Sequence, residues 1–521
     1  MLPKRASDEN GSTGIASDLR PVFSEEKRLL EVLLRLDRGC LSNSSVWATT
    51  SSRLIVDGQT VILNKSDYMK RDPEEIRREM GTLERSSHEE ERMNEYLKAF
   101  VQCNKNRANA MEEVAVDIVM RAQQQAPRAY PFVSFSGGKD STVVSDVVRR
   151  ALGTNEILHI FGDTTLELPT TYSYIDRFKA QNRKIPFIRS RSKHDFHELC
   201  KRIGPPSRVM RWCCTVFKTG PIGRKLDGLK KSHYLTFQGV RHSESVRRSS
   251  YQAISRSPKV ASQTVVAPII YWRDADVWAY IIDKSLDFND AYRYGYTRVG
   301  CWCCPSNSMW SSFLTRVFFP ELAEPWRSFL VDFARSMGKP DPEVYVDTGK
   351  WKARQGGIGV LTASDSLISS RACGDDPNAK IFKLSRPISE NLYEYFKPFG
   401  QIDRSSGSTR TNEVLVIDSS SKQPLLSLQG AIGSSELRIA VIRSSDPTLL
   451  FHRVDCQLRK FQSCILCGGC LSACPNGAIE HRRGSYFIDE TRCVHCLQCV
   501  NKFDTGCLVS KVLQIKRGSE S

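Results

Sequence analysis

The stretch that most constrains the fold is Tyr130–Thr142, which reads Tyr-Pro-Phe-Val-Ser-Phe-Ser-Gly-Gly-Lys-Asp-Ser-Thr. Phe132, Val133 and Phe135 indicate a short buried strand, the two glycines permit a tight turn, and the residues from Ser141 onward have the apolar spacing of an amphipathic helix. A helix start presents unpaired N–H groups and a partial positive charge, which together bind an anion. The stretch therefore predicts a loop that holds a pyrophosphate or a sulfate-like group.

The residues of this loop suit that role. Gly137 and Gly138 let the backbone approach a phosphate, and side chains add further donors at Ser136, Lys139, Ser141 and Thr142. The pattern is not the Walker loop, which requires Gly-x-x-x-x-Gly-Lys-Ser/Thr. Ser-Gly-Gly-Lys-Asp-Ser instead resembles the loop of the ATP pyrophosphatase (PP-loop) superfamily, which implies cleavage of ATP between its α and β phosphates. The alternative is an ordinary glycine-rich turn between a strand and a helix.

The composition indicates a soluble, multidomain protein with metal or redox chemistry. A chain of 521 residues is long enough for about three or four domains. No apolar run approaches the ~20 residues of a membrane span, and the polar first residues lack a signal-peptide core, so we expect a cytoplasmic protein with no membrane partner. The 18 cysteines are clustered, which in the cytosol indicates metal or redox work. The formal charge of +17 suits nucleotides, nucleic acid or an acidic partner, or is simply a solvated surface.

Changes in pattern along the chain predict six segments. These are a disordered tail (1–25), a small β module with helices (26–125), an α/β domain (126–315), a helical then basic extension (316–371), a small α+β module (372–455) and a ferredoxin domain (456–521). Within the first module, Asp57-Gly58 predicts the turn of a two-stranded hairpin. The basic and aromatic stretch Gly349–Gly357 is a candidate contact for nucleic acid, with an ordinary loop as the alternative.

In the α/β domain, strands alternate with helices, which predicts a mainly parallel sheet. A second strand ends in Asp163 and Thr164, and a fourth strand ends in Gly239 and Arg241. Ligands of open α/β sheets bind beyond the carboxyl ends of the strands, so these residues are candidates for nucleotide binding. Asp140 and Asp163 are plausible metal or ribose partners. Arg241 and Lys218 are plausible phosphate clamps, although an arginine in a loop is more often just solvated.

Two cysteine pairs form a further constellation in this domain. Cys213-Cys214 follows a tryptophan, and Cys301-Trp-Cys-Cys304 lies far along the chain from it. Four thiolates hold a [4Fe–4S] cluster or zinc. Buried free thiols are the alternative.

These motifs, with Gly-x-Arg-x-x-x-Ser and Ala267–Ile281, occur in the order seen in the phosphoadenosine phosphosulfate (PAPS) reductase family, over roughly residues 125–310. In the adenylylsulfate reductases of that family, the Cys-Cys and Cys-x-x-Cys pairs ligate one [4Fe–4S] cluster. The resemblance therefore implies a cluster beside the nucleotide, held by Cys213, Cys214, Cys301 and Cys304, with Cys303 as a substitute ligand.

The chain departs from those reductases in two ways. They use a catalytic cysteine in a Glu-Cys-Gly-Leu-His tail, which does not occur in this sequence, and Cys373 is only a weak candidate nucleophile. Their phosphate loop is commonly degenerate, whereas this chain keeps Lys139, Asp140 and Ser141. An intact loop resembles the relatives that adenylate a substrate with ATP and then insert sulfur, including DNA phosphorothioation proteins and sulfur-modifying enzymes of tRNA.

The C-terminal cysteines follow the bacterial ferredoxin spacing, in which the fourth cysteine of each run serves the other cluster. The first run is followed by proline, and the last cysteine of the second run comes after seven residues instead of three. The expected ligand sets are Cys464, Cys467, Cys470 and Cys507 for one [4Fe–4S] cluster, and Cys493, Cys496, Cys499 and Cys474 for the other. Zinc is the alternative metal.

Three functions are compatible with these features. In the first, ATP with Mg²⁺ adenylates an acceptor, with nucleic acid as one candidate, before a sulfur donor reacts; the catalytic candidates are Lys139, Asp140, Asp163 and Arg241. In the second, a sulfonucleotide such as PAPS or adenylylsulfate is reduced to sulfite by electrons from the ferredoxin domain. In the third, the protein is a non-catalytic nucleotide and redox sensor. The intact loop and the missing tail favour the first.

Overall fold

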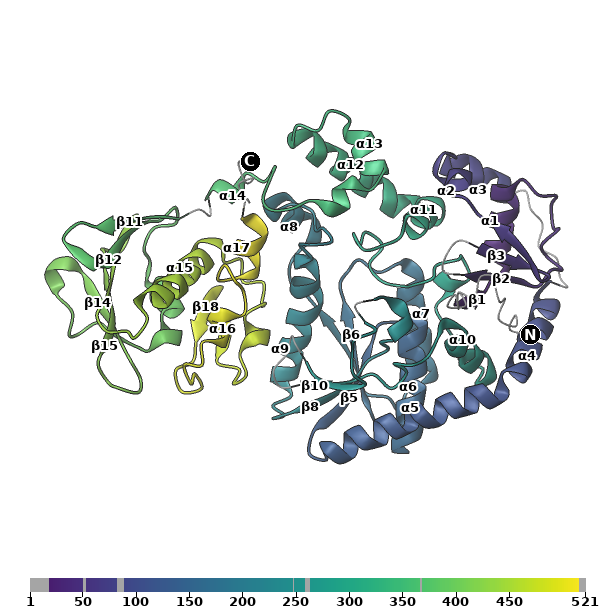
Figure 1. The fold of residues 1–521 in the computed structure, drawn as a ribbon, viewed down its shortest axis with the longest axis horizontal. Coiled ribbons are helices and arrows are strands. Elements are labelled where there is room, and N and C mark those ends of the chain that lie inside the picture. The colour runs from purple at the N-terminus through teal and green to yellow at the C-terminus, as the bar shows by residue number, and fades with distance from the viewer. Residues whose placement is uncertain are drawn as a thin grey trace, which may run out of the picture. The chain divides into compact units, whose positions relative to one another are not determined.

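The computed structural model describes residues 18–49, 53–81, 89–246, 248–257, 263–365 and 368–514 (Figure 1). The chain divides into two compact units, and each is described by itself. The first unit comprises the described parts of Met1–Arg189, Lys231–Ser257 and Gln263–Arg327. The second comprises the described parts of Ser190–Lys230 and Ser328–Ser521. Among the described helices, none has both the length and the apolar character needed to cross a bilayer.

The sheet that carries the phosphate loop has six strands. Their order across the sheet is β7 (Phe187–Arg191), β6 (Leu158–Asp163), β5 (Tyr130–Phe135), β8 (Tyr234–Phe237), β10 (Gln263–Val266) and β9 (Ile254–Arg256). The central strand β5 pairs in parallel with β6 and β8, β8 pairs in parallel with β10, and only β9 is shown to run antiparallel to its neighbour. The predicted α/β fold with a parallel sheet core is therefore confirmed.

Helices flank this sheet in the order that a parallel sheet requires. They include α5 (Lys105–Gln125), α6 (Lys139–Leu152), α7 (Pro169–Gln181) and α10 (Asp274–Asp283). Helix α6 begins two residues before the predicted start because Gly138 is extended and acts as its N-cap, with φ −94° and ψ 157°. Its valines Val143 and Val147 are fully buried. The earlier start places Lys139 and Asp140 in the first turn of the helix.

The N-terminal part of the first unit forms an antiparallel sheet of β1 (Leu19–Pro21), β2 (Val46–Thr49), β3 (Arg53–Val56) and β4 (Gln59–Ile62). Strands β3 and β4 pair around Asp57 and Gly58, which confirms the predicted hairpin turn; both residues have positive φ, as a type I′ turn requires. Its helices are α1 (Ser24–Leu34), α2 (Lys65–Met69), α3 (Pro73–Gly81) and α4 (Glu89–Cys103).

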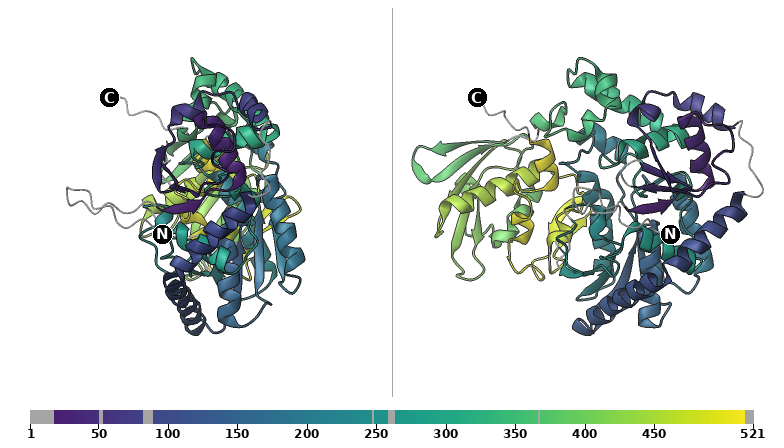
Figure 2. Two further views of the ribbon diagram at one scale, coloured as in Figure 1. Left: turned by 90° about the vertical axis from the view of Figure 1, so that its right-hand side faces the viewer. Right: turned by 45° about the vertical axis from the view of Figure 1, so that its right-hand side comes forward.

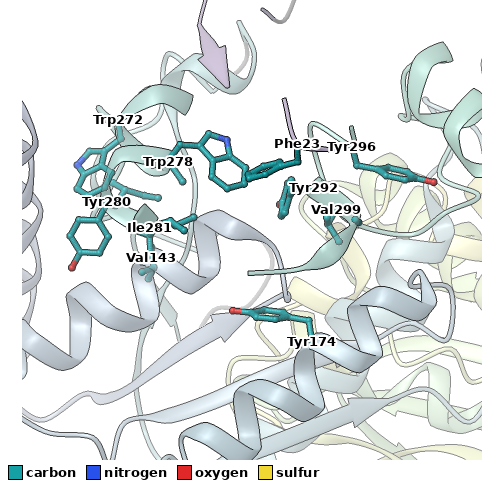
Figure 3. Close-up of a cluster of buried hydrophobic side chains, with 14 of the residues drawn as sticks. Phe23, Val143, Tyr174, Trp272, Trp278, Tyr280, Ile281, Tyr292, Tyr296 and Val299 are labelled. Atoms are coloured by element: carbon teal, nitrogen blue, oxygen red, sulfur yellow. The ribbon is translucent and has the colours of Figure 1, made fainter. Parts of the chain in front are cut away.

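The predicted disordered tail is wrong for its last residues, whereas residues 1–17 lie outside the described part of the chain. Strand β1 pairs with β2, and Phe23 packs in the core of the α/β domain, 5.4 Å from the ring of Trp278 (Figure 3). The ring of Trp278 is in turn 5.5 Å from Tyr292. The polar composition of this stretch concealed Leu19, Val22 and Phe23, whose burial compensates for the cost of ordering the backbone.

The second unit contains a six-stranded antiparallel sheet (Figure 2). The strand order is β11 (Ser369–Cys373), β12 (Asp376–Lys383), β16 (Glu436–Val441), β15 (Pro424–Gln429), β14 (Glu413–Ile417) and β13 (Gln401–Asp403). The predicted α+β module thus contains these strands, together with a 3₁₀ segment, η5 (Glu390–Tyr395). Helix α15 (Pro447–Ser463) then leads to the cysteine-rich end, with β17 (Ile479–Arg482), β18 (Ser485–Ile488), α16 (Gln498–Asn501) and α17 (Leu508–Leu513).

The remaining segments are mainly helical. In chain order they are α8 (Phe196–Ile203), η1 (Cys214–Thr219), α9 (Gly220–Gly228), α11 (Met309–Phe318), α12 (Pro320–Ser336), α13 (Pro342–Asp347), η4 (Lys350–Ala353) and α14 (Thr362–Asp365). In the basic and aromatic stretch, Trp351, Lys352 and Arg354 are buried, and Arg354 donates to the carbonyl of Pro205 at 2.6 Å. These three side chains are structural, which favours the ordinary-loop interpretation over contact with nucleic acid.

Candidate functional site

The loop between β5 and α6 has a backbone that only glycine permits. Gly137 has φ +73°, and a Cβ atom there would lie 3.0 Å from the Cγ2 atom of Thr171. The buried side chain of Asn289 donates to the carbonyl of Gly137 at 3.1 Å and to the hydroxyl of Thr171 at 3.0 Å. The loop is therefore held in one conformation before any ligand binds.

The hydroxyl groups around the loop shape it. Ser141 Oγ donates to the carbonyl of Gly138 at 2.8 Å and accepts from the N–H of Ser136 at 3.2 Å. The hydroxyl of Thr142 lies 2.6 Å from that of Tyr174, and the N–H of Lys139 donates to the hydroxyl of Tyr292 at 3.0 Å. Ser141 and Thr142, expected as phosphate donors, instead bond within the protein.

Backbone N–H groups remain as the donors for an anion. Within the described residues, the N–H groups of Gly137, Gly138 and Asp140 donate to no protein acceptor. They lie at the start of α6, where the helix dipole adds a partial positive charge. This is the arrangement that binds a phosphate or sulfate group.

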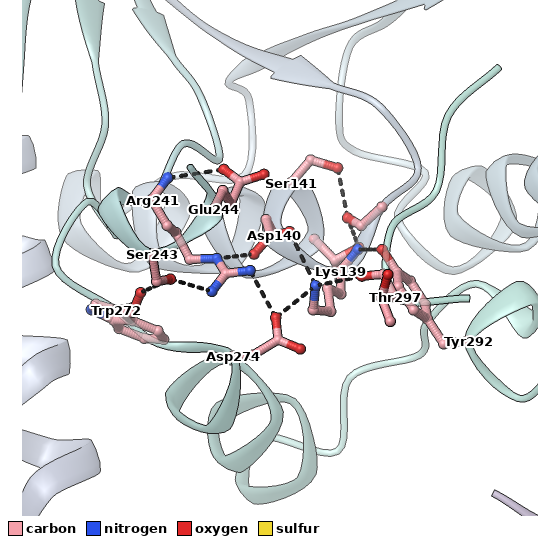
Figure 4. Close-up of polar contacts among 12 residues, drawn as sticks. Lys139, Asp140, Ser141, Arg241, Ser243, Glu244, Trp272, Asp274, Tyr292 and Thr297 are labelled. Carbon is pink, nitrogen blue, oxygen red and sulfur yellow. Dashed lines mark hydrogen bonds and ion pairs between the residues drawn. The ribbon is translucent and has the colours of Figure 1, made fainter. Parts of the chain in front are cut away.

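A buried ion network lies beside these groups (Figure 4). The ammonium of Lys139 is 2.9 Å from Asp274 Oδ1 and 3.4 Å from Asp140 Oδ2. Arg241 reaches the same two carboxylates, with its Nε atom 2.6 Å from Asp140 Oδ1 and its Nη2 atom 2.7 Å from Asp274 Oδ1. Two cations and two carboxylates thus neutralise one another.

The network keeps Lys139 and Asp140 charged at neutral pH. Burial alone would lower the pKa of Lys139, but Asp140 and Asp274 more than offset it, and the pKa is raised. Burial alone would raise the pKa of Asp140, but Lys139 and Arg241 hold it below its ordinary value. The side chains of Lys139 and Arg241 are only 2% and 5% exposed, so these ion pairs are poorly screened by solvent.

Arg241 lies inside this ion network, and its role as a phosphate clamp stays a prediction. It is buried, so the solvated alternative is wrong, and its guanidinium contacts carboxylates and the hydroxyl of Ser243 at 3.1 Å. Gly239 lies just before it, and a Cβ atom there would lie 2.8 Å from the carbonyl carbon of Asp140. Gly239 is therefore needed for the close approach of two backbone segments.

Two acidic residues of this site were not among the predicted ones. Asp274 begins α10 and lies inside the Ala267–Ile281 motif, which is the only sequence signal for it. Asp18 accepts from the N–H groups of Asp274 at 2.6 Å and Ala275 at 3.2 Å, and lies 3.9 Å from Arg241 Nη1. Burial raises the pKa of Asp18. Its position in the expected disordered tail concealed it. Asn289 and Tyr292 were also missed, because neither belongs to a recognisable motif.

The end of β6 carries a second cluster of polar side chains. Asp163 is fully buried and accepts from Tyr172 Oη at 2.9 Å and from Arg189 Nε at 2.8 Å. The hydroxyl of Thr164 donates to Glu167 at 2.8 Å and lies 3.3 Å from Cys301 Sγ. Cys301 therefore lies at the carboxyl end of the sheet.

The two cysteine pairs of the core differ in the local structure that holds them. Cys213 and Cys214 follow Trp212, which is fully buried and donates from Nε1 to the carbonyl of Gly204 at 3.1 Å. They lead into η1, a π-helical segment of a kind frequent at functional sites. At the other pair, the N–H of Cys304 donates to the carbonyl of Cys301 at 3.2 Å.

Cys213 and Cys214 belong to the second unit, and Cys301 and Cys304 belong to the first. Lys218 also belongs to the second unit, whereas the phosphate loop belongs to the first. A cluster shared by Cys213, Cys214, Cys301 and Cys304 therefore remains a prediction, and so does the phosphate clamp at Lys218. Cys303 is buried, whereas Cys301 and Cys304 are half-buried, which makes Cys303 the less accessible ligand.

The C-terminal cysteines lie near one another, and their division into two ligand sets stays a prediction. Four of them line one recess: Cys474, Cys493, Cys496 and Cys499. In the other group, burial and neighbouring thiols raise the pKa of Cys467 and of Cys507 to about 12. The thiols that act on Cys467 are Cys464 and Cys507. Those that act on Cys507 are Cys464 and Cys470. Each group supplies four thiols, the donor set of a [4Fe–4S] cluster.

A single zinc ion and a cubane cluster require different spacings of their four thiolates. Four thiolates on one zinc ion would lie about 3.8 Å apart, given Zn–S bonds of about 2.3 Å in a tetrahedron. Within the described ranges, no three His, Cys, Asp or Glu side chains converge on a single-ion site. In a cubane each thiolate binds a different iron, so wider spacing is expected.

Comparison with known proteins identifies the class of each domain. Residues 130–307 match the family model described as phosphoadenosine phosphosulfate reductase domain, and residues 463–502 match the one described as 4Fe-4S dicluster domain. The chain therefore carries a PAPS reductase domain and a C-terminal dicluster ferredoxin domain.

Individual known proteins also match parts of the chain. Two proteins of Methanocaldococcus jannaschii, both described as uncharacterized, are 28% identical over 263 and 260 residues; each match covers 50% of this chain and 54% or 61% of the relative. The chain thus spans between half and two thirds of their length. The adenosine 5'-phosphosulfate reductase of Staphylococcus epidermidis is 28% identical over 175 residues, covering 33% of this chain and 69% of the relative. A solved PAPS reductase from Candida auris has 18% identity and a TM-score of 0.29, over 38% of this chain and 95% of that one.

Proposed function

We propose that the protein is a sulfonucleotide reductase, which converts adenylylsulfate or PAPS to sulfite with electrons from its own dicluster domain. The observation that carries this proposal is a close backbone contact within the second unit. A Cβ atom on Gly220, at the start of α9, would lie 3.2 Å from the carbonyl of Cys467 and 3.4 Å from that of Gly468. The segment that follows Cys213 and Cys214 therefore packs directly on a cluster-binding loop.

The reaction needs electrons, which explains this contact. Adenylylsulfate, two electrons and one proton give AMP and hydrogen sulfite; the bond between sulfur and the bridging oxygen breaks, and sulfur is reduced from +6 to +4. When bound, each [4Fe–4S] cluster carries one electron, so a dicluster domain holds the two that are consumed. Adenylation by ATP consumes none.

The phosphate loop supports the same choice. The N–H groups of Gly137, Gly138 and Asp140 would bind the anionic end of the nucleotide, and Lys139 and Arg241 would hold the loop through Asp140 and Asp274. Both carboxylates are already paired, so neither is available to Mg²⁺ without breaking a buried ion pair. A sulfonucleotide has no pyrophosphate leaving group that would require the metal.

ATP-dependent adenylation followed by sulfur transfer is the second candidate. It is supported by the retained Lys139, Asp140 and Ser141 and by a loop wide enough to present three N–H donors. In this function Asp140 and Asp163 would contact Mg²⁺ or ribose, and a sulfur donor and an acceptor would be needed. The named relatives that match the reductase domain favour the first candidate.

Product analysis separates the two candidates. Full-length protein with reconstituted clusters is incubated anaerobically with titanium(III) citrate, since dithionite would itself produce sulfite. Separate tubes contain adenylylsulfate, PAPS or ATP. Equal amounts of sulfite and AMP from adenylylsulfate, or of sulfite and adenosine 3',5'-bisphosphate from PAPS, are expected. AMP and pyrophosphate from ATP alone would replace the proposal with the second candidate, and no product from any nucleotide would favour the sensor.

A further inference from the structure

The contact between α9 and the dicluster domain brings an arginine against one cluster-binding loop only. Gly468 has φ +79°, and a Cβ atom on it would overlap Nη1 of Arg224. On the same loop, a Cβ atom on Gly469 would lie 3.1 Å from Thr215 Cγ2 and 3.6 Å from Cys467 Sγ. The loop Cys467–Gly469 is thus covered by the side chains of Thr215, from η1, and Arg224, from α9.

The charge of Arg224 is only weakly compensated. It is half-buried, and within the described residues it forms no ion pair with a carboxylate at 4.0 Å or less. Burial lowers the pKa of Arg224, while Cys467 and Asp227 act in the opposite direction. A cation that is partly removed from water and has no close counter-ion acts strongly on the next negative group, which here is the thiolate of Cys467.

The second predicted ligand set has a different surrounding. Its recess is lined by Arg492, but this arginine is paired with Asp489 at 3.0 Å and with Glu480. Arg224 is not among the residues that line this recess. Lys460 is a buried cation that lies beside both ligand sets, because its ammonium donates to the carbonyl of Cys499 at 2.9 Å and its charge also acts on Cys470. Arg224 is therefore the cation that distinguishes one ligand set from the other.

We propose that Arg224 is a positioning residue of the reductase domain that raises the reduction potential of the cluster held by Cys464, Cys467, Cys470 and Cys507. Uptake of one electron by a [4Fe–4S] cluster adds one negative charge, and a nearby guanidinium stabilises that charge. This cluster becomes the better electron acceptor of the two and lies next to the segment that carries Cys213 and Cys214. The effect of Arg224 on the potential does not depend on the proposed function. That electrons then flow from this cluster toward Cys213 and Cys214 rests on the proposed function.

The test is a redox titration of the full-length reconstituted protein, followed by electron paramagnetic resonance without any nucleotide. In R224M, the equilibrium constant for reduction of one cluster is expected to fall at least tenfold. For one electron this lowers the midpoint potential of that signal by about 59 mV. R224K retains the charge and should keep most of the wild-type potential. K225M removes an exposed charge from the next position of the same helix and should leave both signals unchanged.

Ligand variants identify the signal that moves. C467S and C496S each keep an oxygen ligand and alter the spectrum of one cluster, which assigns the two signals. A shift confined to the signal that C467S alters supports the proposal. An unchanged midpoint in R224M, an equal shift of both signals, or a shift of the signal that C496S alters would overturn it. If R224M loses iron, R224Q and R224K decide the result. Because no nucleotide is present, failure of the proposed activity would leave this outcome intact.

Discussion

The phosphate loop and the dicluster domain differ in whether the buried positive charges beside them are neutralised. At the loop, Lys139 and Arg241 are neutralised by Asp140 and Asp274, and uncharged N–H groups are left to receive the anion. At the loop Cys467–Gly469, the positive charge of Arg224 is only weakly compensated, by Asp227, and lies beside Cys467. A nucleotide arrives with its own charge and needs a shaped, rigid site, whereas a redox centre changes its charge and responds to a fixed one.

The two regions also differ in how they are assembled. The loop site takes side chains from segments as distant in sequence as Asp18, Asp140, Arg241 and Asp274. The ferredoxin ligands come mainly from two short runs of cysteines. We therefore expect single substitutions around the loop to act on stability through long-range contacts, and the following predictions test that expectation in order of expected effect.

The largest effect is expected for D274N. The substitution leaves Lys139 and Arg241 buried with one carboxylate fewer, and breaking a buried ion pair costs about 3–5 kcal/mol. Hydrogen exchange of the amides of α6, read by mass spectrometry, reports the local free energy of opening. D117N, which breaks an exposed pair with Arg121, should cost less than about 1 kcal/mol. Equal effects of the two variants would contradict the importance of the network.

G239A should have the next largest effect. The added methyl group would lie 2.8 Å from the backbone of Asp140, and overpacking of this kind costs about 1–3 kcal/mol. The first turn of α6 would shift, so nucleotide affinity measured by calorimetry should fall at least about tenfold. G228A is the matched control, because a Cβ atom there meets nothing within 4 Å. Wild-type affinity in G239A would argue against the close backbone approach.

D18N should change stability by about 1 kcal/mol or less, with a defined pH dependence. Burial raises the pKa of Asp18 above its ordinary value of 3.8, so between pH 3.8 and the folded-state pKa the folded state binds more protons than the unfolded state. Asp18 therefore makes the wild-type protein less stable as pH rises from about 3.8 through the folded-state pKa, and D18N should not show this component. Urea midpoints of both proteins across this range give the difference. A difference independent of pH would place Asp18 outside the buried network.

The smallest effect is expected for C303A. Cys303 is buried, whereas Cys301 and Cys304 are half-buried, so removal of Cys303 should leave the iron content of the reconstituted protein unchanged. C304A should lower the iron content by one cluster, about four iron atoms per chain. Loss of iron in C303A but not in C304A would make Cys303 the ligand.

Local features of the chain were predictable from the sequence. The strand, glycine turn and helix at Tyr130–Leu152 follow from residue pattern, and the hairpin at Asp57 and Gly58 follows from turn chemistry. The two C-terminal ligand sets are predicted from cysteine spacing, and the described structure places the four thiols of one set around one recess. In each case the residues that decide the structure are close together in the sequence.

Only the tertiary structure decided how the loop is charged. Asp18 lay in an expected polar tail, Asp274 lay inside a longer motif, and Asn289 and Tyr292 belonged to no motif, yet all four contact the loop or its network. Their roles depend on packing, through the burial of Phe23 and the positions of α10 and η3 (Asp290–Tyr292). A sequence determines which groups are available locally, but burial and long-range pairing determine whether a charge is free to act or is already neutralised.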